Sequence, residues 1–267
     1  MTEKDKKVKD IIQELYRFRA EIPTNLNIKK IKQVWGIDIK QKEIPLLIEP
    51  RKNIIEKKVR IAKNSLNFFL IKSFVKFVAI SGSVASGFAD KDDDIDLFIV
   101  TKNDAAWIYR LLLYLKNVFY KKIRLKGKVD RGQKVKDKLC INLITEQRAL
   151  TFDEDIFNLN EILYVKPLYN RKYMKILYLT NPWIRDKYML SENFVNRKDI
   201  SVGEIKELTK RNWLLFPINL FCFLGQVLFM LVANHKPDLE RLWEGYKKGR
   251  IEFYPKEFKN EKLKGLN

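Results

Sequence analysis

The chain has 267 residues, of which 46% are hydrophobic, so it is long enough for one large domain or two small ones with a buried core. Its 53 Lys and Arg residues outnumber its 33 Asp and Glu residues, and the net charge of +20 is typical either of a protein that binds a polyanion such as RNA or of a basic, AT-rich proteome. The single histidine and the two cysteines, Cys140 and Cys222, which both lie in apolar runs, argue against zinc chemistry and against a Ser-His or Cys-His nucleophile. The charged N-terminus lacks the apolar stretch of a signal peptide, and these features together predict a cytoplasmic protein.

Residues 1–75 are predicted to be a helical segment. Apolar residues recur at helical spacing over 5–20, and a short helix is expected over 28–35, with Gly36 ending it. A longer basic stretch over 51–74 is also predicted to be helical. Its basic face would either be solvated or lie along the path of a nucleotide or RNA.

Two strands separated by a glycine-containing loop follow. The apolar run over 77–80 predicts a buried strand, and the run over 94–100 predicts a second one. Between them lie Gly82 and Ser83. Because Gly has no side chain, backbone N–H groups and a hydroxyl could approach a phosphate closely at this point.

Asp94 and Asp96 are the candidate metal ligands. Because successive residues of a strand point to opposite faces, both carboxylates are predicted to lie on the same side. Two carboxylates that close repel each other unless a proton or a cation lies between them, and such oxygen ligands suit a Mg²⁺ ion that also contacts substrate phosphates. A solvated acidic turn at Asp90 and 92–96 is the alternative, but it does not explain why Asp96 lies inside an apolar run.

This stretch resembles the DNA polymerase β-like nucleotidyltransferase superfamily, whose signature is an apolar strand, Gly-Ser and then Asp-h-Asp-h, where h is apolar. Gly82-Ser83 and Asp94-Ile95-Asp96-Leu97 match that signature. The resemblance implies an α+β fold with a small mixed sheet flanked by helices. It also implies that a nucleoside monophosphate is transferred from an NTP, such as ATP, to an acceptor. Asp94 and Asp96 would be the catalytic residues and hold Mg²⁺ or Mn²⁺, and Gly82 and Ser83 would bind the triphosphate.

A helix over 105–120, with Asn103 and Asp104 as candidate caps, and a third strand over 138–145 are predicted next. In the resembling family this strand often carries a third carboxylate, which joins the metal site and helps to deprotonate the attacking hydroxyl. The sequence has Asn142 there. An amide can offer its carbonyl oxygen to a metal or to a nucleotide, but it cannot act as a base.

Three interpretations of Asn142 remain open. The enzyme could work with two carboxylates, or another acid could replace the third, or the domain could bind a nucleotide or RNA without catalysis. The acids considered are Asp130, Glu146 and Glu161. The acceptor could be an RNA end, a small hydroxyl compound or a protein side chain, and a protein partner could complete the site.

The region over 151–267 is predicted to be mainly helical and to pack on a nucleotidyltransferase core over 76–150. Helices are expected over 153–164, 172–179, 183–190 and 238–246. The stretch over 212–235 has no charged residue and is long enough to suggest a membrane anchor. Pro217 near its start and a polar stripe every seven residues favour a buried helix instead. The stripe consists of Asn212, Asn219 and Gln226.

Overall fold

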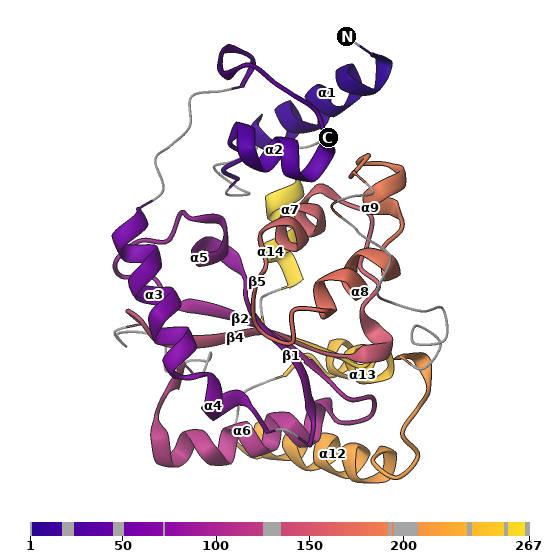
Figure 1. The fold of residues 1–267 in the computed structure, drawn as a ribbon. Coiled ribbons are helices and arrows are strands. Elements are labelled where there is room, and N and C mark those ends of the chain that lie inside the picture. The colour runs from indigo at the N-terminus through magenta and orange to yellow at the C-terminus, as the bar shows by residue number, and fades with distance from the viewer. Residues whose placement is uncertain are drawn as a thin grey trace.

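A mixed β-sheet forms the centre of the molecule, and helices surround it (Figure 1). The computed structural model describes residues 2–17, 24–44, 51–71, 73–124, 135–191, 194, 208–233, 237–253 and 256–264. Within these residues the sheet consists of β1 (Val75–Ile80), β2 (Ile95–Thr101), β3 (Ile123–Arg124), β4 (Leu139–Glu146), β5 (Lys166–Tyr169) and β6 (Arg250–Glu252). The architecture confirms the predicted α+β class.

The strand order is β3-β4-β2-β1-β5, with β6 pairing with β4. Strand β1 is antiparallel to both β2 and β5, β4 is parallel to β2 and β3, and β6 is antiparallel to β4. The three predicted strands correspond to β1, β2 and β4. Strands β3, β5 and β6 have only two to four residues each, so their apolar pattern is too short to be recognised in the sequence.

Helices precede, connect and follow these strands. In the described residues they are α1 (Glu3–Arg17), α2 (Ile28–Trp35), α3 (Lys52–Asn64), α4 (Leu66–Phe69), α5 (Gly82–Ser86), α6 (Ala106–Tyr120), α7 (Ile156–Tyr164), α8 (Tyr173–Thr180), α9 (Trp183–Asp186), α12 (Phe216–Val232), α13 (Leu239–Lys248) and α14 (Lys256–Leu263), with 3-10 turns η1 (Gln41–Glu43) and η3 (Gln147–Ala149). The predicted helix over 28–35 matches α2, which ends at Gly36 in the left-handed conformation. The predicted single helix over 51–74 is divided at Ser65 into α3 and the short α4, and the helical part ends at Phe69.

The two central strands place alternate residues in two different cores. Val78 and Leu97 belong to a core that also contains residues of α3, α6 and α12. Phe77 and Phe98 belong to a second core, which α8 covers. Both faces of the sheet are therefore buried, which explains the continuous apolar runs over 77–80 in β1 and over 97–100 in β2.

The first two helices pack against helices from the second half of the chain. Residues of α1 and α2 share one hydrophobic core with α7 and α9, and Figure 1 shows them lying beside α7. The fully buried Trp35 donates its indole N–H to the carbonyl of Tyr188 (2.8 Å). The hydroxyl of Tyr16 donates to the carbonyl of Leu26 and so ties α1 to the start of α2. These contacts hold α1 against α2 and attach α2 to the segment that follows α9.

Helix α12 directs its polar residues inward. The side-chain oxygen of the buried Asn219 accepts hydrogen bonds from the backbone N–H groups of Trp107 (2.9 Å) and Ile108 (3.3 Å) at the start of α6. Gln226 donates to the carbonyl of Trp107 (3.0 Å) and accepts from Arg110 (2.9 Å). The cap of α6 therefore comes from α12, and the prediction that Asn103 and Asp104 cap this helix is wrong. Their side chains instead bind the backbone of residues 208–212.

The opposite side of α12 is exposed, so the prediction of a buried helix is correct for one face only. Phe221 is 77% exposed and Val232 is 79% exposed, while Trp213 (74%) and Leu214 (84%) are exposed just before the helix. Phe119, at the end of the neighbouring α6, is 82% exposed. In the described part of the chain, no helix combines the length and the apolar character that crossing a membrane requires.

Candidate active site

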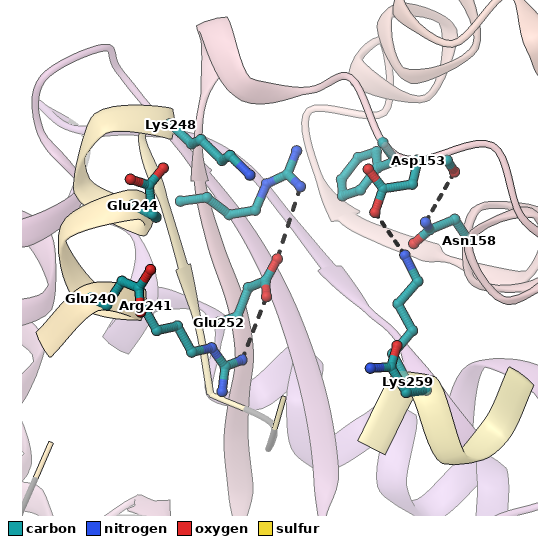
Figure 2. A pocket seen from close by; sticks show the side chains of 11 residues that line it. Asp153, Asn158, Glu240, Arg241, Glu244, Lys248, Glu252 and Lys259 are labelled. Atoms are coloured by element: carbon teal, nitrogen blue, oxygen red, sulfur yellow. Dashed lines mark hydrogen bonds and ion pairs between the residues drawn. The ribbon is translucent and has the colours of Figure 1, made fainter. Parts of the chain in front are cut away.

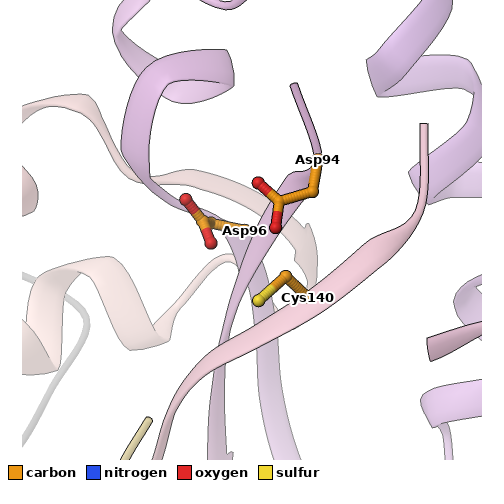
Figure 3. Close-up of side chains that lie close together, drawn as sticks. All are labelled: Asp94, Asp96 and Cys140. Atoms are coloured by element: carbon orange, nitrogen blue, oxygen red, sulfur yellow. The ribbon is translucent and has the colours of Figure 1, made fainter. Parts of the chain in front are cut away.

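The two predicted carboxylates lie at one end of β2. Asp94 immediately precedes this strand, and Asp96 is its second residue. One oxygen of each carboxylate and the sulfur of Cys140 lie within 4.8 Å of one another (Figure 3). Carboxylate oxygens and a thiolate sulfur are both ligands of divalent metals, and the spacing is short enough for all three to surround one ion. The residues present therefore fit a divalent cation.

The register of the sheet brings Cys140, rather than Asn142, next to Asp96. In the parallel pair of β2 and β4, Asp96 pairs with Cys140. Between Leu97 and Phe98 the register shifts, so Asn142 has no partner in β2. Its carbonyl accepts a hydrogen bond from Phe253 on the other side of β4. Cys140 is fully buried, in agreement with the apolar run around it, but that run gave no sign of its position beside the carboxylates.

Gly82 brings the backbone against Asp96. It begins α5 directly after β1 and has a φ of +62°, a conformation that residues with a side chain rarely adopt. A Cβ atom at this position would lie 2.5 Å from a carboxylate oxygen of Asp96. Ser81 adds to this contact by donating its N–H to the carbonyl of Asp96 (3.0 Å). The glycine–serine bend and the paired carboxylates thus lie next to each other.

The site combines a strand, the bend at Gly82 and Ser83, and paired aspartates on the adjacent strand. These are the signature features of the DNA polymerase β-like nucleotidyltransferase superfamily. Residues 59–182 match the family model of the nucleotidyltransferase domain. This part of the chain is a nucleotidyltransferase domain. It includes strands β1 to β5, whereas α1 and α2 precede it and α12 to α14 follow it. No curated protein and no solved structure matches the chain.

Glu161 is a further acid beside the candidate site of the nucleotidyltransferase domain. Its carboxylate accepts a hydrogen bond from the backbone N–H of Gly82. Burial, and to a smaller degree the negative charge of Asp96, raise the pKa of Glu161 to about 7. The side chain therefore holds the glycine bend in place, and it exchanges a proton near neutral pH.

Glu146 and Asp130 are the two other acids considered as replacements for a third carboxylate. Glu146 pairs with Thr101 at the far end of β2 and is therefore remote from Asp96. Its carboxylate accepts a hydrogen bond from Arg148 (2.8 Å), and burial raises its pKa. Asp130 lies outside the described residues.

Cations surround the acidic turn that leads into the candidate site. Arg124 on β3, opposite Cys140, donates a hydrogen bond to the carboxylate of Asp94. The fully buried Lys58 on α3 donates to the carbonyl of Asp93 and to the carboxylate of Asp137 (3.1 Å). Arg124 thus offsets part of the negative charge of the carboxylate pair, and Lys58 holds the turn in position. The basic face predicted for the helix over 51–74 is therefore partly buried.

Ser83 belongs to the glycine–serine bend, but its hydroxyl group points to the acidic turn at Asp90 and 92–96. It donates to the carboxylate of Asp93 (3.3 Å), and the same carboxylate accepts from the N–H of Asp90 (2.9 Å). The carbonyl of Ser83 accepts hydrogen bonds from the residues that follow α5. In this state Ser83 organises the loop around the candidate site.

A pocket away from the cluster of Asp94, Asp96 and Cys140 is lined by none of the predicted site residues (Figure 2). It lies between α13, β6, α14 and the segment that precedes α7. Glu252 pairs with both Arg241 (3.5 Å) and Arg250 (3.8 Å), and Lys259 pairs with Asp153 (2.8 Å). Its charged groups therefore pair with one another and attach α14 to the rest of the chain.

Proposed function

We propose that the protein is a divalent-metal-dependent nucleotidyltransferase that transfers a nucleoside monophosphate from an NTP to an acceptor hydroxyl. The main support is the direct approach of Gly82 to Asp96, within a cluster that also contains Asp94 and Cys140. It provides metal ligands and a side-chain-free backbone turn at one place, which is the combination that phosphoryl-transfer chemistry requires.

The reaction is a substitution at the α-phosphorus of the NTP. The acceptor oxygen forms a bond to this phosphorus, the bond from it to the oxygen that bridges to the β-phosphate breaks, and pyrophosphate leaves with the bonding electrons. The proton of the acceptor hydroxyl passes to a base or to water. A divalent cation, when bound, neutralises the phosphate charge and lowers the pKa of the attacking group.

Each residue of the candidate site has a separate role in this proposal. Asp94 and Asp96 hold the cation, with Cys140 as a third ligand. Gly82, together with Ser83, leaves room for the triphosphate, and Asn142 remains a candidate for contact with the nucleotide. Because Cys140 is the β4 residue beside Asp96 and Glu146 lies at the far end of the strand, β4 supplies no third carboxylate next to the pair, and alignment of the substrates accounts for much of the rate.

The test is pyrophosphate release from each of the four NTPs with Mg²⁺ or Mn²⁺, in the presence of total RNA and of small hydroxyl acceptors. Asp96→Asn keeps the shape of the side chain but removes its charge, and it should abolish release. Asp92→Asn is the matched control, because Asp92 lies in the same turn but is exposed and pairs with Lys136 (3.7 Å). Full activity of the Asp96 variant would refute the proposal.

The second candidate is a module that binds a nucleotide or RNA without catalysis. The observation that favours it is the thiol of Cys140 in the position next to Asp96, where a third carboxylate would supply a base. This candidate predicts salt-dependent binding of nucleotides without pyrophosphate release under any combination of NTP, metal and acceptor. Release that depends on Asp96 would eliminate it.

A further inference from the structure

Lys166 lies beside the Gly82 bend and Lys30 lies near Lys166, and neither has a carboxylate partner among the residues that the structure describes. Lys166 begins β5 and pairs with Ile80, the last residue of β1. Its ammonium group donates to the carbonyl of Val84 in α5 (3.2 Å). Lys30 on α2 donates to the carbonyl of Leu163 in α7 (3.1 Å). Both groups are therefore held by backbone carbonyls, which carry only partial negative charge.

The surroundings of these two lysines are unfavourable for positive charge. Burial lowers the pKa of Lys166, and burial together with the charge of Lys166 lowers the pKa of Lys30. The Lys30 ammonium lies 5.8 Å from the ring centre of Tyr164 and 5.4 Å from that of Phe194, contacts that compensate only part of the lost hydration. Two like charges that are both desolvated and close together raise the free energy of the folded protein, unless an anion bound between them offsets the repulsion and the lost hydration.

We propose that Lys30 and Lys166 bind a phosphate group of a substrate, an inference that rests on the proposed nucleotidyl transfer. Phosphate carries a charge of about −2 and several acceptor oxygens, which matches two neighbouring ammonium donors. Lys166 reaches α5 two residues after Gly82, so the bound phosphate lies next to the bend. Lys30 belongs to α2, outside residues 59–182, so the helices that precede the nucleotidyltransferase domain supply part of its substrate site.

The experiment measures the binding of tripolyphosphate by calorimetry, without NTP or acceptor. Lys30→Gln and Lys166→Gln should each weaken binding about tenfold, the effect of one hydrogen bond between charged groups. Lys29→Gln is the matched control, because Lys29 is the exposed neighbour on α2 and its loss changes the net charge equally. Lys30→Arg keeps the charge and should retain most of the binding, and urea unfolding confirms that α2 remains packed on α7.

Two further arms distinguish the sources of the phosphate. If the ATP affinity falls in the glutamine variants, the lysines bind the triphosphate, and if only the affinity for a short single-stranded RNA falls, they bind the acceptor. Either result supports the proposal. Unchanged tripolyphosphate binding in folded Lys30→Gln and Lys166→Gln proteins, or an equal loss in Lys29→Gln, would overturn it. Because this assay requires no turnover, its outcome is independent of whether pyrophosphate release depends on Asp96.

Discussion

Gly82→Ala tests the contact on which the candidate site depends. A residue with a Cβ atom in the left-handed conformation, here at a φ of +62°, loses about 1–2 kcal/mol. The added Cβ would lie 2.5 Å from the Asp96 carboxylate, whereas such contacts are essentially never closer than 3.0 Å, so the carboxylate must move by at least about 0.5 Å. Because a carboxylate is the end of a flexible side chain, this movement costs little folding energy but displaces a metal ligand.

We therefore expect a small loss of stability and a large loss of activity. The free energy of unfolding should fall by about 1–3 kcal/mol, measured by urea denaturation followed by circular dichroism. Pyrophosphate release should fall by about a hundredfold, since displacing a catalytic group by less than 1 Å is enough for such a loss. The metal concentration needed for half-maximal activity should rise, because Asp96 no longer lies in its original position.

Gly225→Ala is the control for this substitution. Gly225 lies within α12, and a Cβ atom there would have no atom within 4 Å apart from its chain neighbours and the backbone of its own helix. The substitution should raise the free energy of unfolding by up to about 1 kcal/mol and leave pyrophosphate release unchanged. If Gly82→Ala has wild-type activity, or if both alanine variants lose activity equally, the inferred contact between the bend and Asp96 is not functional.

Three further predictions follow from single contacts. Because the pKa of Glu161 is raised from 4.5 to about 7, its contribution to the free energy of unfolding is complete below pH 4.5 and is lost as the pH rises through about 7. Glu161→Gln should therefore reduce the fall of the free energy of unfolding over this pH range, measured by urea unfolding without metal. The same pH dependence in both proteins would contradict the assignment. A thiolate prefers softer cations, so the activity with Mn²⁺ should exceed the activity with Mg²⁺. In metal titrations, Cys140→Asp should shift this preference toward Mg²⁺. The same metal preference in both proteins would argue against Cys140 as a ligand. Asn219→Leu leaves two backbone donors of α6 unpaired and should cost about 1–3 kcal/mol in urea unfolding, while a cost near zero would show that water replaces the amide.

The local elements of the core could be predicted from the sequence because they depend on short-range patterns. Alternation of acidic and apolar residues identified β2 and the common direction of Asp94 and Asp96, and the small residues after β1 indicated a turn at Gly82. Hydrophobic periodicity was sufficient for α2, α6 and α7, whose observed bounds differ from the predicted ones by a few residues. These features require only the chemistry of neighbouring residues.

The partners of the site residues were decided by tertiary structure. A one-residue irregularity between β2 and β4 places Cys140 beside Asp96, and a strand register cannot be read from one strand alone. Glu161 reaches the Gly82 bend from α7, and Lys30 comes near Lys166 from α2, although both helices are far from the bend in sequence. The polar stripe of α12 was visible in the sequence, but only its packing on α6 shows that Asn219 caps that helix while apolar residues face outward. Contacts between distant segments depend on how whole elements pack, and a pattern within one element carries no information about them.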